Sequence, residues 1–248
     1  MNSYCKFASY YDTLTTDVDY ISYAKYIKQL FELHNLNPSL VLDLACGTGS
    51  LSFALEKMGY DVIGVDNSEQ MLAKAFEKAQ KTKSKAMFIC QDMQELDLYG
   101  TVDAVACSLD SINHLTAPQK VINTFKKVSL FLNPDGLFIF DINSEYKFKN
   151  ILSDNTFVYD YNEVYCVWQN SYNSKTKLCR FDLTFFENNN EKYTRYDESF
   201  YERAYSQKNI EKYLSEAGLV LENIYGENTI TKPTNESHRL IYVVRKAV

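Results

Sequence analysis

Two glycines and several acidic residues in the first half of the chain end or directly follow short apolar runs. Gly47 and Gly49 follow the first run, Asp66 ends the second and Asp92 follows the third. A glycine lets the backbone approach a ligand closely because it has no Cβ atom. A carboxylate offers two acceptor oxygens, which suit the two hydroxyl groups of a ribose or an exocyclic amine of a base. Each residue alone is also explained by a tight turn or a helix cap, but the series together indicates a nucleoside-binding site.

The elements that would position these residues alternate along the chain. Continuous apolar runs are typical of strands buried on both faces, and segments with helical spacing of apolar residues lie between them. This alternation predicts a parallel sheet covered by helices, in which ligands bind beyond the carboxyl ends of the strands. The expected strands are residues 40–45, 62–66, 87–90, 102–107 and 136–142, and the expected helices are residues 20–34, 50–58, 69–81 and 118–132.

The pattern changes after residue 142. In residues 143–205, 16 of 63 residues are aromatic, compared with 15% of the whole chain, and no strong helical spacing occurs. Apolar and polar residues alternate in 178–186, as in a half-buried strand. We therefore expect a Rossmann-like α/β domain with a seven-stranded sheet, residues 1–142 and 206–248, and an inserted antiparallel β lid, residues 143–205. The remaining expected elements are strands 157–168, 178–186 and 193–205, a helix around 210–217 that ends at Gly218, and strands 219–225 and 240–244.

Two residues near the first glycines distinguish between nucleoside ligands. The dinucleotide-binding fingerprint has a third glycine, where this chain has Ser52. Asp43 lies at the end of the first expected strand, and its carboxylate would repel a pyrophosphate there. S-adenosylmethionine has no phosphate and carries a sulfonium and an amino group, so it suits this site better. A nicotinamide-dependent dehydrogenase is the less favoured alternative.

At these positions the chain resembles the class I S-adenosylmethionine-dependent methyltransferases of the small-molecule type. Asp43–Gly49 (DLACGTG), Gly64–Leu72 (GVDNSEQML) and Cys90–Met93 (CQDM) resemble their first three motifs in order and spacing. Asn133–Leu137 resembles the turn before their fifth strand, although that turn is more often Pro-Gly-Gly. Phe7–Asp12 resembles the N-terminal aromatic segment that covers the cofactor in many relatives. The resemblance extends over residues 5–142 and, more loosely, over residues 206–248.

The resemblance implies S-adenosylmethionine as the cofactor and assigns residues to its parts. Asp43 and the backbone of Ala45 and Gly47 would meet the methionine portion, and Asp66 would hold the ribose. Met71 would contact the adenine, although ordinary helix packing also explains this residue. The full set of implied cofactor-binding residues is Tyr11, Asp43, Ala45, Cys46, Gly47, Thr48, Gly49, Asp66, Asn67, Met71, Gln91, Asp92, Met93 and Cys107.

The implied reaction is in-line displacement of the methyl group by a nucleophile, either an amine or a hydroxyl. A general base accelerates transfer to a hydroxyl, and His114 follows the fourth expected strand with Asp110 nearby. A histidine with a purely structural role is the alternative. An acidic residue that ends the fifth strand and aromatic residues of the insert are candidate substrate contacts, although capping and packing also explain them. These candidates are Asp141, Tyr165, Trp168, Tyr196 and Tyr201.

Composition narrows the range of partners. The formal net charge is −6, which argues against a surface that binds duplex DNA. The resemblance to methyltransferases with a comparable small β-insert implies a small-molecule substrate. No apolar run approaches the roughly 20 residues of a membrane-spanning helix, and the first residues do not resemble a signal peptide. We therefore expect a cytoplasmic protein that does not enter membranes. The six cysteines form no C-x-x-C pair, so we expect no metal site. A protein that binds S-adenosylmethionine and regulates a partner without turnover is a further alternative, and the oligomeric state is open.

Overall fold

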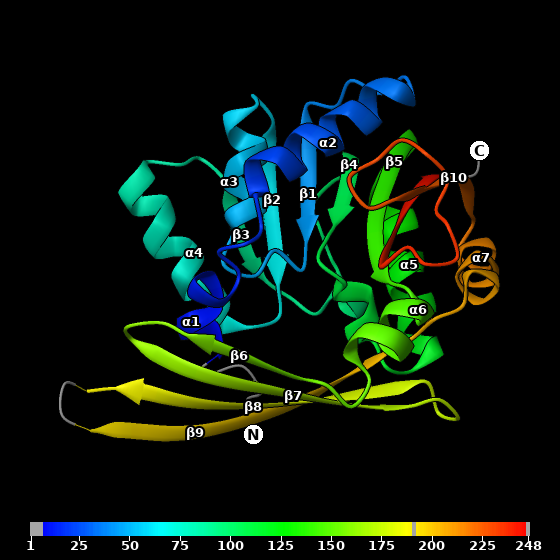
Figure 1. Ribbon diagram of the computed structural model, residues 1–248. Coiled ribbons are helices and arrows are strands. Elements are labelled where there is room, and N and C mark those ends of the chain that lie inside the picture. Colours follow the sequence, from blue (N-terminus) through cyan, green and yellow to red (C-terminus); the bar gives the residue numbers. More distant parts are fainter. Residues whose placement is uncertain (1–6, 190–191, 247–248) are drawn as a thin grey trace.

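The computed structural model describes residues 7–189 and 192–246, which form two sheets (Figure 1). The larger sheet has seven strands in the order β10-β11-β5-β4-β1-β2-β3, and the smaller sheet has the order β6-β7-β8-β9. The strands are β1 (Leu40–Leu44), β2 (Asp61–Asp66), β3 (Met87–Cys90), β4 (Val102–Cys107), β5 (Leu132–Asn143), β6 (Thr156–Asp160), β7 (Val164–Asn173), β8 (Leu178–Asn188), β9 (Tyr193–Arg203), β10 (Leu219–Gly226) and β11 (Arg239–Lys246).

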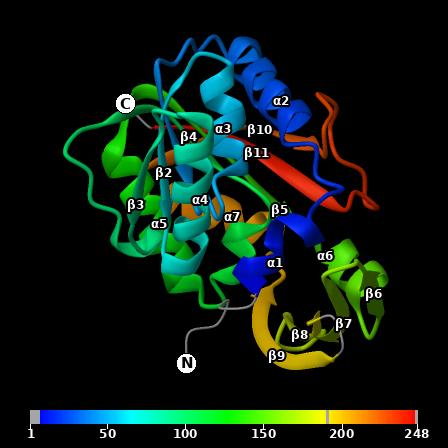
Figure 2. The same cartoon turned by 90° about the vertical axis from the view of Figure 1, so that its left-hand side faces the viewer.

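Helices cover the seven-stranded sheet on both faces (Figure 2). The α-helices are α1 (Phe7–Leu14), α2 (Tyr20–Leu33), α3 (Ser50–Lys57), α4 (Glu69–Thr82), α5 (Pro118–Phe131), α6 (Glu145–Lys147) and α7 (Gln207–Glu216), and the short turns of other helix types are η1 (Met93–Glu95), η2 (Ser111–His114) and η3 (Phe148–Leu152).

The seven-stranded sheet is parallel from β1 to β5 and antiparallel at β10 and β11. Two apolar cores lie on its faces, one formed with α5 and α7 and the other with α2 and α3. Each fully buried Val, Leu, Ile or Phe side chain stabilises the fold by about 1.5–3 kcal/mol relative to an exposed one. These observations confirm the predicted Rossmann-like fold class with a second, antiparallel sheet.

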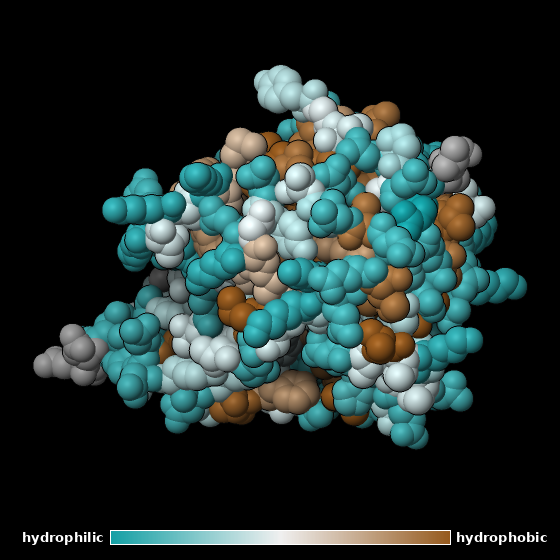
Figure 3. Space-filling view, turned by 90° about the horizontal axis from the view of Figure 1, so that it is seen from above, coloured by the Kyte–Doolittle hydropathy of each residue, from teal (hydrophilic) through white to brown (hydrophobic). Residues whose placement is uncertain are grey.

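The four-stranded sheet lies across the carboxyl ends of β1 and β2, with α1 between the two sheets (Figure 1). Its buried face alternates along each strand and packs on side chains of α1, which form a third apolar cluster with it. The opposite pole of the molecule, seen in Figure 3, presents mostly hydrophilic residues with hydrophobic ones interspersed. The carboxyl ends of β1 and β2 therefore face α1 and the smaller sheet.

One local prediction was wrong, and two helical segments were not predicted. The expected single strand 157–168 is two strands, β6 and β7, joined by a turn in which Tyr161 and Val164 exchange backbone hydrogen bonds. Aromatic and β-branched residues on both sides of this turn hide it in the sequence. Residues 145–152 are helical although no helix was expected there, and Ser144 caps them by accepting a hydrogen bond from the backbone N–H of Lys147. Helix α1 was likewise not predicted as a helix.

Five cysteines in the described part of the chain are free thiols, and Cys5 lies outside the described residues. Within residues 7–189 and 192–246, none of the helices combines the length and the apolar character needed to span a bilayer.

Candidate functional site

A cavity of about 290 Å³ lies at the carboxyl ends of β1, β2 and β4, and α1 contributes Phe7 and Tyr11 to its wall. It is within the size range of small-ligand sites, at the lower end. The wall brings together residues that are far apart in the sequence, from α1 to the first turn of α5. Nine of the predicted site residues line it, namely Tyr11, Ala45, Gly47, Asp66, Asn67, Met71, Asp92, Met93 and His114.

Two smaller hollows adjoin this cavity. One of about 30 Å³ is lined by Asp43, Cys46 and Thr48 together with Tyr11 and Gly47. The other, of about 20 Å³, is lined by Gln91 beside Asn67 and Met93. The predicted cofactor residues that line none of the three spaces are Gly49 and Cys107.

Gly49 and Cys107 have structural environments that explain them without a ligand. Gly49 has φ +77°, and a Cβ there would lie 2.9 Å from the Phe88 ring, so this turn requires glycine at that position. Cys107 is the last residue of β4, and its buried side chain belongs to the core formed with α5. Gly47 differs from Gly49, because a Cβ at Gly47 would meet nothing within 4 Å.

The Asp66 carboxylate connects two loops in the cavity wall. Its Oδ2 accepts a hydrogen bond from the backbone N–H of Gly47 at 2.8 Å, and its Oδ1 accepts one from Ser68 at 2.8 Å. Burial raises the pKa of Asp66, and the backbone donors partly oppose that effect. The side chain of Asp92 accepts from Gln94, whose backbone N–H lies 2.9 Å from its Oδ1. Gln91 bonds both backbone groups of Asp97.

Asp43, the acid of the first motif, is buried, with 1% of its surface exposed. Ser52, which stands at the third glycine position of the dinucleotide fingerprint, donates its hydroxyl to Asp43 Oδ2 at 2.5 Å. Burial raises the pKa of Asp43 to about 7. The hydroxyl of Tyr20 in the same hollow is buried, and none of the described residues gives it a hydrogen bond of normal geometry.

The raised pKa of Asp43 predicts a pH dependence of folding. Unfolded aspartate ionises near its ordinary pKa, whereas Asp43 in the folded protein resists ionisation up to about pH 7. Its contribution to stability is therefore present at low pH and is lost as the pH rises through about 7. We expect Asp43→Asn to lose less stability than the wild type between about pH 5 and pH 8, measured by urea unfolding. Equal losses would contradict this assignment.

Helix α1 is attached to the glycine loop by charged and polar side chains that the sequence did not indicate. Asp12 accepts a hydrogen bond from the Thr48 hydroxyl at 2.7 Å and pairs with Lys78 Nζ at 2.7 Å. Lys78 also donates to Thr48 at 2.9 Å and to Ser50 at 3.0 Å. The Thr48 side chain is thus bonded to α1 and α4, and it contributes to the site by holding α1 over the cavity.

The loop after β4 contains two successive residues in the left-handed region, Leu109 (φ +55°) and Asp110 (φ +56°). Such backbone is costly for residues other than glycine unless its surroundings hold it. The Asp141 carboxylate accepts both of their backbone N–H groups, at 2.8 and 2.7 Å. Tyr23 donates its hydroxyl to Asp141 at 2.7 Å, and Arg239 pairs with Asp141 and, at 2.6 Å, with Asp110.

Asp141 therefore lies beneath the cavity wall and does not line the cavity. It is fully buried at the end of β5 and supports the loop that carries Leu109 and Ser111, both of which do line it. Sequence reasoning found Asp141 but missed its partners, because Tyr23 and Arg239 lie 118 and 98 residues away along the chain.

His114 ends η2 and lines the cavity. Its ring lies against Phe200 of β9 with centroids 5.2 Å apart. Its Nε2 lies 3.7 Å from Glu202 Oε1, and Asp110, His114 and Glu202 each place one titratable atom within 4.8 Å of the others. Burial lowers the pKa of His114, and the charge of Asp110 raises it.

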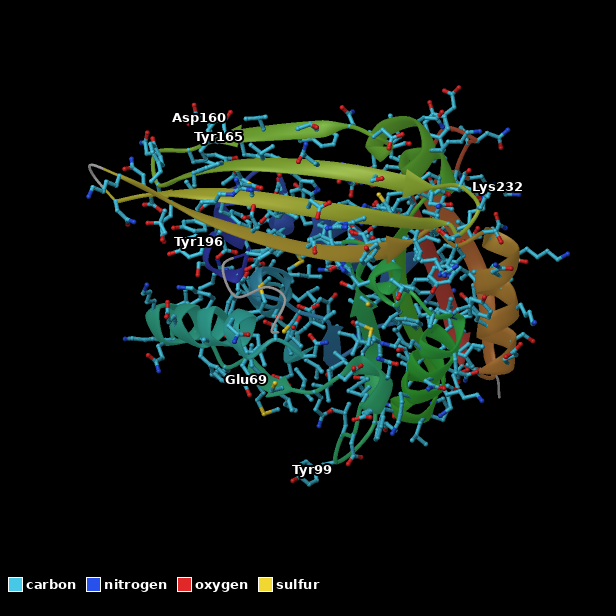
Figure 4. The ribbon with its side chains drawn as sticks, turned by 90° about the horizontal axis from the view of Figure 1, so that it is seen from below. Glu69, Tyr99, Asp160, Tyr165, Tyr196 and Lys232 are labelled. Atoms are coloured by element: carbon cyan, nitrogen blue, oxygen red, sulfur yellow. The ribbon has the colours of Figure 1, made fainter. Side chains whose placement is uncertain are left out.

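The four aromatic candidates of the insert divide between the two faces of the smaller sheet. Trp168 and Tyr196 pair with Leu183 and Phe185 on the face that packs on α1, and Trp168 lies 6.1 Å from Phe7. Tyr165 and Tyr201 pair with Phe186 and Arg180, which alternate to the outer face. Figure 4 labels one residue of each pair, Tyr196 and Tyr165. None of the four lines the cavity.

Comparison with known proteins assigns the chain to a family. Residues 41–136 match the family described as "Methyltransferase domain". The chain is 34% identical over 245 residues to "Putative methyltransferase YqeM" of Bacillus subtilis (strain 168), covering 98% of this chain and 97% of that protein. It is 35% identical to the crystal structure of an S-adenosylmethionine-dependent methyltransferase from Clostridium acetobutylicum ATCC 824, with a TM-score of 0.89 and 99% of each chain covered.

The chain therefore belongs to the S-adenosylmethionine-dependent methyltransferases. Its cofactor is S-adenosylmethionine, and its activity is transfer of the cofactor's methyl group. The sugar N-methyltransferase KedS8 from Streptoalloteichus sp ATCC 53650 shares the fold, with a TM-score of 0.78, 18% identity and coverage of 96% of this chain and 93% of that one.

Proposed function

We propose that this methyltransferase acts on a nitrogen or oxygen atom of a small molecule bound in the 290 Å³ cavity. The observation that carries the proposal is the composition of that cavity, whose wall joins the predicted nucleoside-binding residues to His114. Helix α1 contributes Phe7 and Tyr11 to the cavity wall, and the smaller sheet lies on the far side of α1, which suits a compact acceptor better than a macromolecule. Solved structures with the same fold include a sugar N-methyltransferase and a glycopeptide N-methyltransferase, which supports this substrate class.

The residues present fit S-adenosylmethionine. Gly47 lines the cavity, and the space where a Cβ would stand is open. Asp66 places a carboxylate in the same wall. The adjoining hollow offers Asp43 and the buried hydroxyl of Tyr20 to an amino-acid portion. Met71 supplies apolar surface for the base. The cofactor supplies a methyl group already activated by its sulfonium, so the protein's task is to position the acceptor and exclude water.

His114 is the proton acceptor in this proposal. A hydroxyl loses its proton as its bond to the methyl carbon forms, whereas a protonated amine must lose a proton before its nitrogen can attack. A neutral imidazole in the cavity wall can take either proton. Burial lowers the pKa of His114, which keeps the ring neutral and ready as an acceptor. Asp110 lies close enough to stabilise the resulting positive charge.

The smaller sheet is proposed to be the substrate lid. It acts mainly by supporting α1, which lines the cavity. Trp168 and Tyr196 lie on the face beside α1, and α1 in turn carries Phe7 and Tyr11 into the cavity wall. Tyr10 of α1 donates its hydroxyl to Glu187 of β8 at 2.5 Å. Closure of the lid and placement of α1 over the cavity are thus mechanically connected.

Replacing Asp66 with alanine should weaken binding of the product S-adenosylhomocysteine by about 10- to 150-fold. This corresponds to about 1.5–3 kcal/mol, the contribution of hydrogen bonds to a charged group. Isothermal titration calorimetry measures the effect directly. Asp61→Asn is the matched control, because Asp61 is an exposed acid at the opposite end of the same strand. Unchanged affinity in Asp66→Ala would contradict the assignment of Asp66 to the ribose.

The proposed function is tested by incubating the protein with S-adenosylmethionine labelled in its methyl group and an extract separated into small molecules, nucleic acids and proteins. We expect label to appear in the small-molecule fraction alone. Label in a macromolecular fraction would overturn the substrate class. Label in none of the fractions, with the cofactor still retained by the protein, would favour a regulatory binding protein without turnover.

A further inference from the structure

The smaller sheet places an acidic side chain against His114, on a face that is otherwise mostly apolar. Glu202 of β9 points to the same side of the smaller sheet as Phe200 and is only 3% exposed. Its Oε2 accepts a hydrogen bond from Asn143 Nδ2 at 3.3 Å, and its Oε1 faces His114 Nε2 at 3.7 Å. Burying a carboxyl group is costly unless charged or polar groups compensate for lost water, so the position of Glu202 requires a partner.

The charges around this pair come from several elements. Arg239 of β11 pairs with Asp110 and Asp141, and its Nε also lies 3.4 Å from the exposed Glu227. Lys147 of α6 donates to Asn143 Oδ1 at 2.8 Å, and Lys120 of α5 is an exposed residue of the cavity wall. When all three are ionised, the partly exposed Asp110 and the buried Asp141 and Glu202 outnumber the nearby cations Arg239 and Lys147 by one.

A positive charge on His114 would balance this excess. The imidazole is the titratable group that faces Glu202 most closely in the cluster, and Phe200 covers its ring at 5.2 Å. That cover keeps the pair in surroundings of low polarity, where opposite charges attract more strongly than in water.

We propose that Glu202 is a positioning residue for His114, holding Nε2 toward the lid and stabilising the imidazolium that forms when His114 takes the substrate's proton. The inference rests on the proposed role of His114 as proton acceptor. The proton moves from the acceptor atom of the substrate to the imidazole and later to water, and Glu202 forms no covalent bond. The proton acceptor is then complete only when the smaller sheet is docked on the α/β domain.

Burial shifts the pKa values of Glu202 and His114 in opposite directions. It raises the pKa of Glu202 and lowers that of His114, so each group alone favours its neutral form. Two groups this close titrate as a pair with shared apparent pKa values. The form ready to accept a proton, ionised Glu202 beside neutral His114, therefore appears only above the pair's apparent pKa.

The test is an NMR titration of the histidine side chains in the complex with S-adenosylhomocysteine, comparing the wild type with Glu202→Gln. Removing the carboxylate should lower the pKa of His114 by about one pH unit or more, the usual effect of an opposite charge at this distance. The control is Asp197→Asn, which removes an exposed carboxylate paired with Arg195 on the outer face of the same strand. That variant should leave the pKa of His114 unchanged, and the resonance of His34 serves as an internal reference.

An unchanged pKa of His114 in Glu202→Gln would overturn the proposal. If that variant does not fold, the wild type decides the question, because the carboxyl carbon of Glu202 and the ring of His114 should inflect at the same pH. Independent inflections would refute the pair. The role of His114 as proton acceptor fails separately if the NMR coupling is present but the pH profile of turnover is the same in wild type and Glu202→Gln. The proposed methyl transfer to a small molecule fails separately again, in the label experiment.

Discussion

Replacing Asp141 with alanine is expected to lower the free energy of unfolding by about 3–5 kcal/mol, the usual cost of removing one partner of a buried ion pair. The substitution leaves Arg239 partly unpaired and the Tyr23 hydroxyl without its acceptor. It also releases the left-handed backbone of Leu109 and Asp110, whose N–H groups Asp141 holds. Urea unfolding followed by circular dichroism measures the change.

The matched control for this prediction is Asp160→Ala, which removes an exposed acid of β6 (Figure 4). We expect this control to change the free energy of unfolding by less than about 0.5 kcal/mol. A similarly small effect of Asp141→Ala would mean that the buried ion pair does not hold the loop, and the account of the cavity wall would then be wrong.

Replacing His114 with glutamine is expected to reduce turnover by about 10²–10⁴-fold, the range for loss of a general base. Binding of S-adenosylhomocysteine should be nearly unchanged, because the predicted cofactor contacts lie on other residues of the wall. The control His34→Gln removes a histidine bonded to Glu222 and Tyr225 on the far side of the sheet. Initial rates with the identified acceptor measure the effect.

Retained turnover in His114→Gln would assign His114 a structural role and leave bulk water as the proton acceptor. This outcome would be consistent with an amine substrate that reaches the site already deprotonated. A catalytic and a structural role of His114 predict different pH profiles of turnover. Replacing His114 shifts the acidic limb of that profile only if His114 is the base.

The gathering of the residues after β1, β2 and β3 around one cavity was predictable from sequence, because each residue follows directly on its strand. In a parallel sheet, residues just after consecutive strands come to the same edge, so Gly47, Asp66 and Met93 could be brought together before the structure was known. The turn positions carry their own signals. Gly49 has φ +77° and Ser68 caps α4 by accepting a hydrogen bond from Met71 N–H.

The acidic and basic partners of the site could not be predicted, because they depend on pairing across the whole chain. Arg239 meets Asp110 across 129 residues, and Glu202 reaches His114 from the lid. Neither residue stands in a motif. A single basic or acidic residue in a strand reads as a solvated side chain until the register of that strand is known.

Which aromatic residues of the insert face α1 could also not be predicted without the strand register. Alternation along β8 divides its side chains between two faces, but it does not say which face is buried. Pairing of β7 with β8 puts Trp168 on the face beside α1 and Tyr165 on the other. The sequence could thus identify a sheet rich in aromatic residues, while the choice among them needed the register.

The most direct test of the account is a crystal structure of the protein with S-adenosylhomocysteine. We expect the ligand to occupy the 290 Å³ cavity, with its ribose hydroxyls on the Asp66 carboxylate and its amino-acid portion in the hollow beside Asp43 and Tyr20. The thioether sulfur should then face the part of the cavity lined by His114. A ligand bound elsewhere, or one whose sulfur is separated from His114 by protein atoms, would contradict the account.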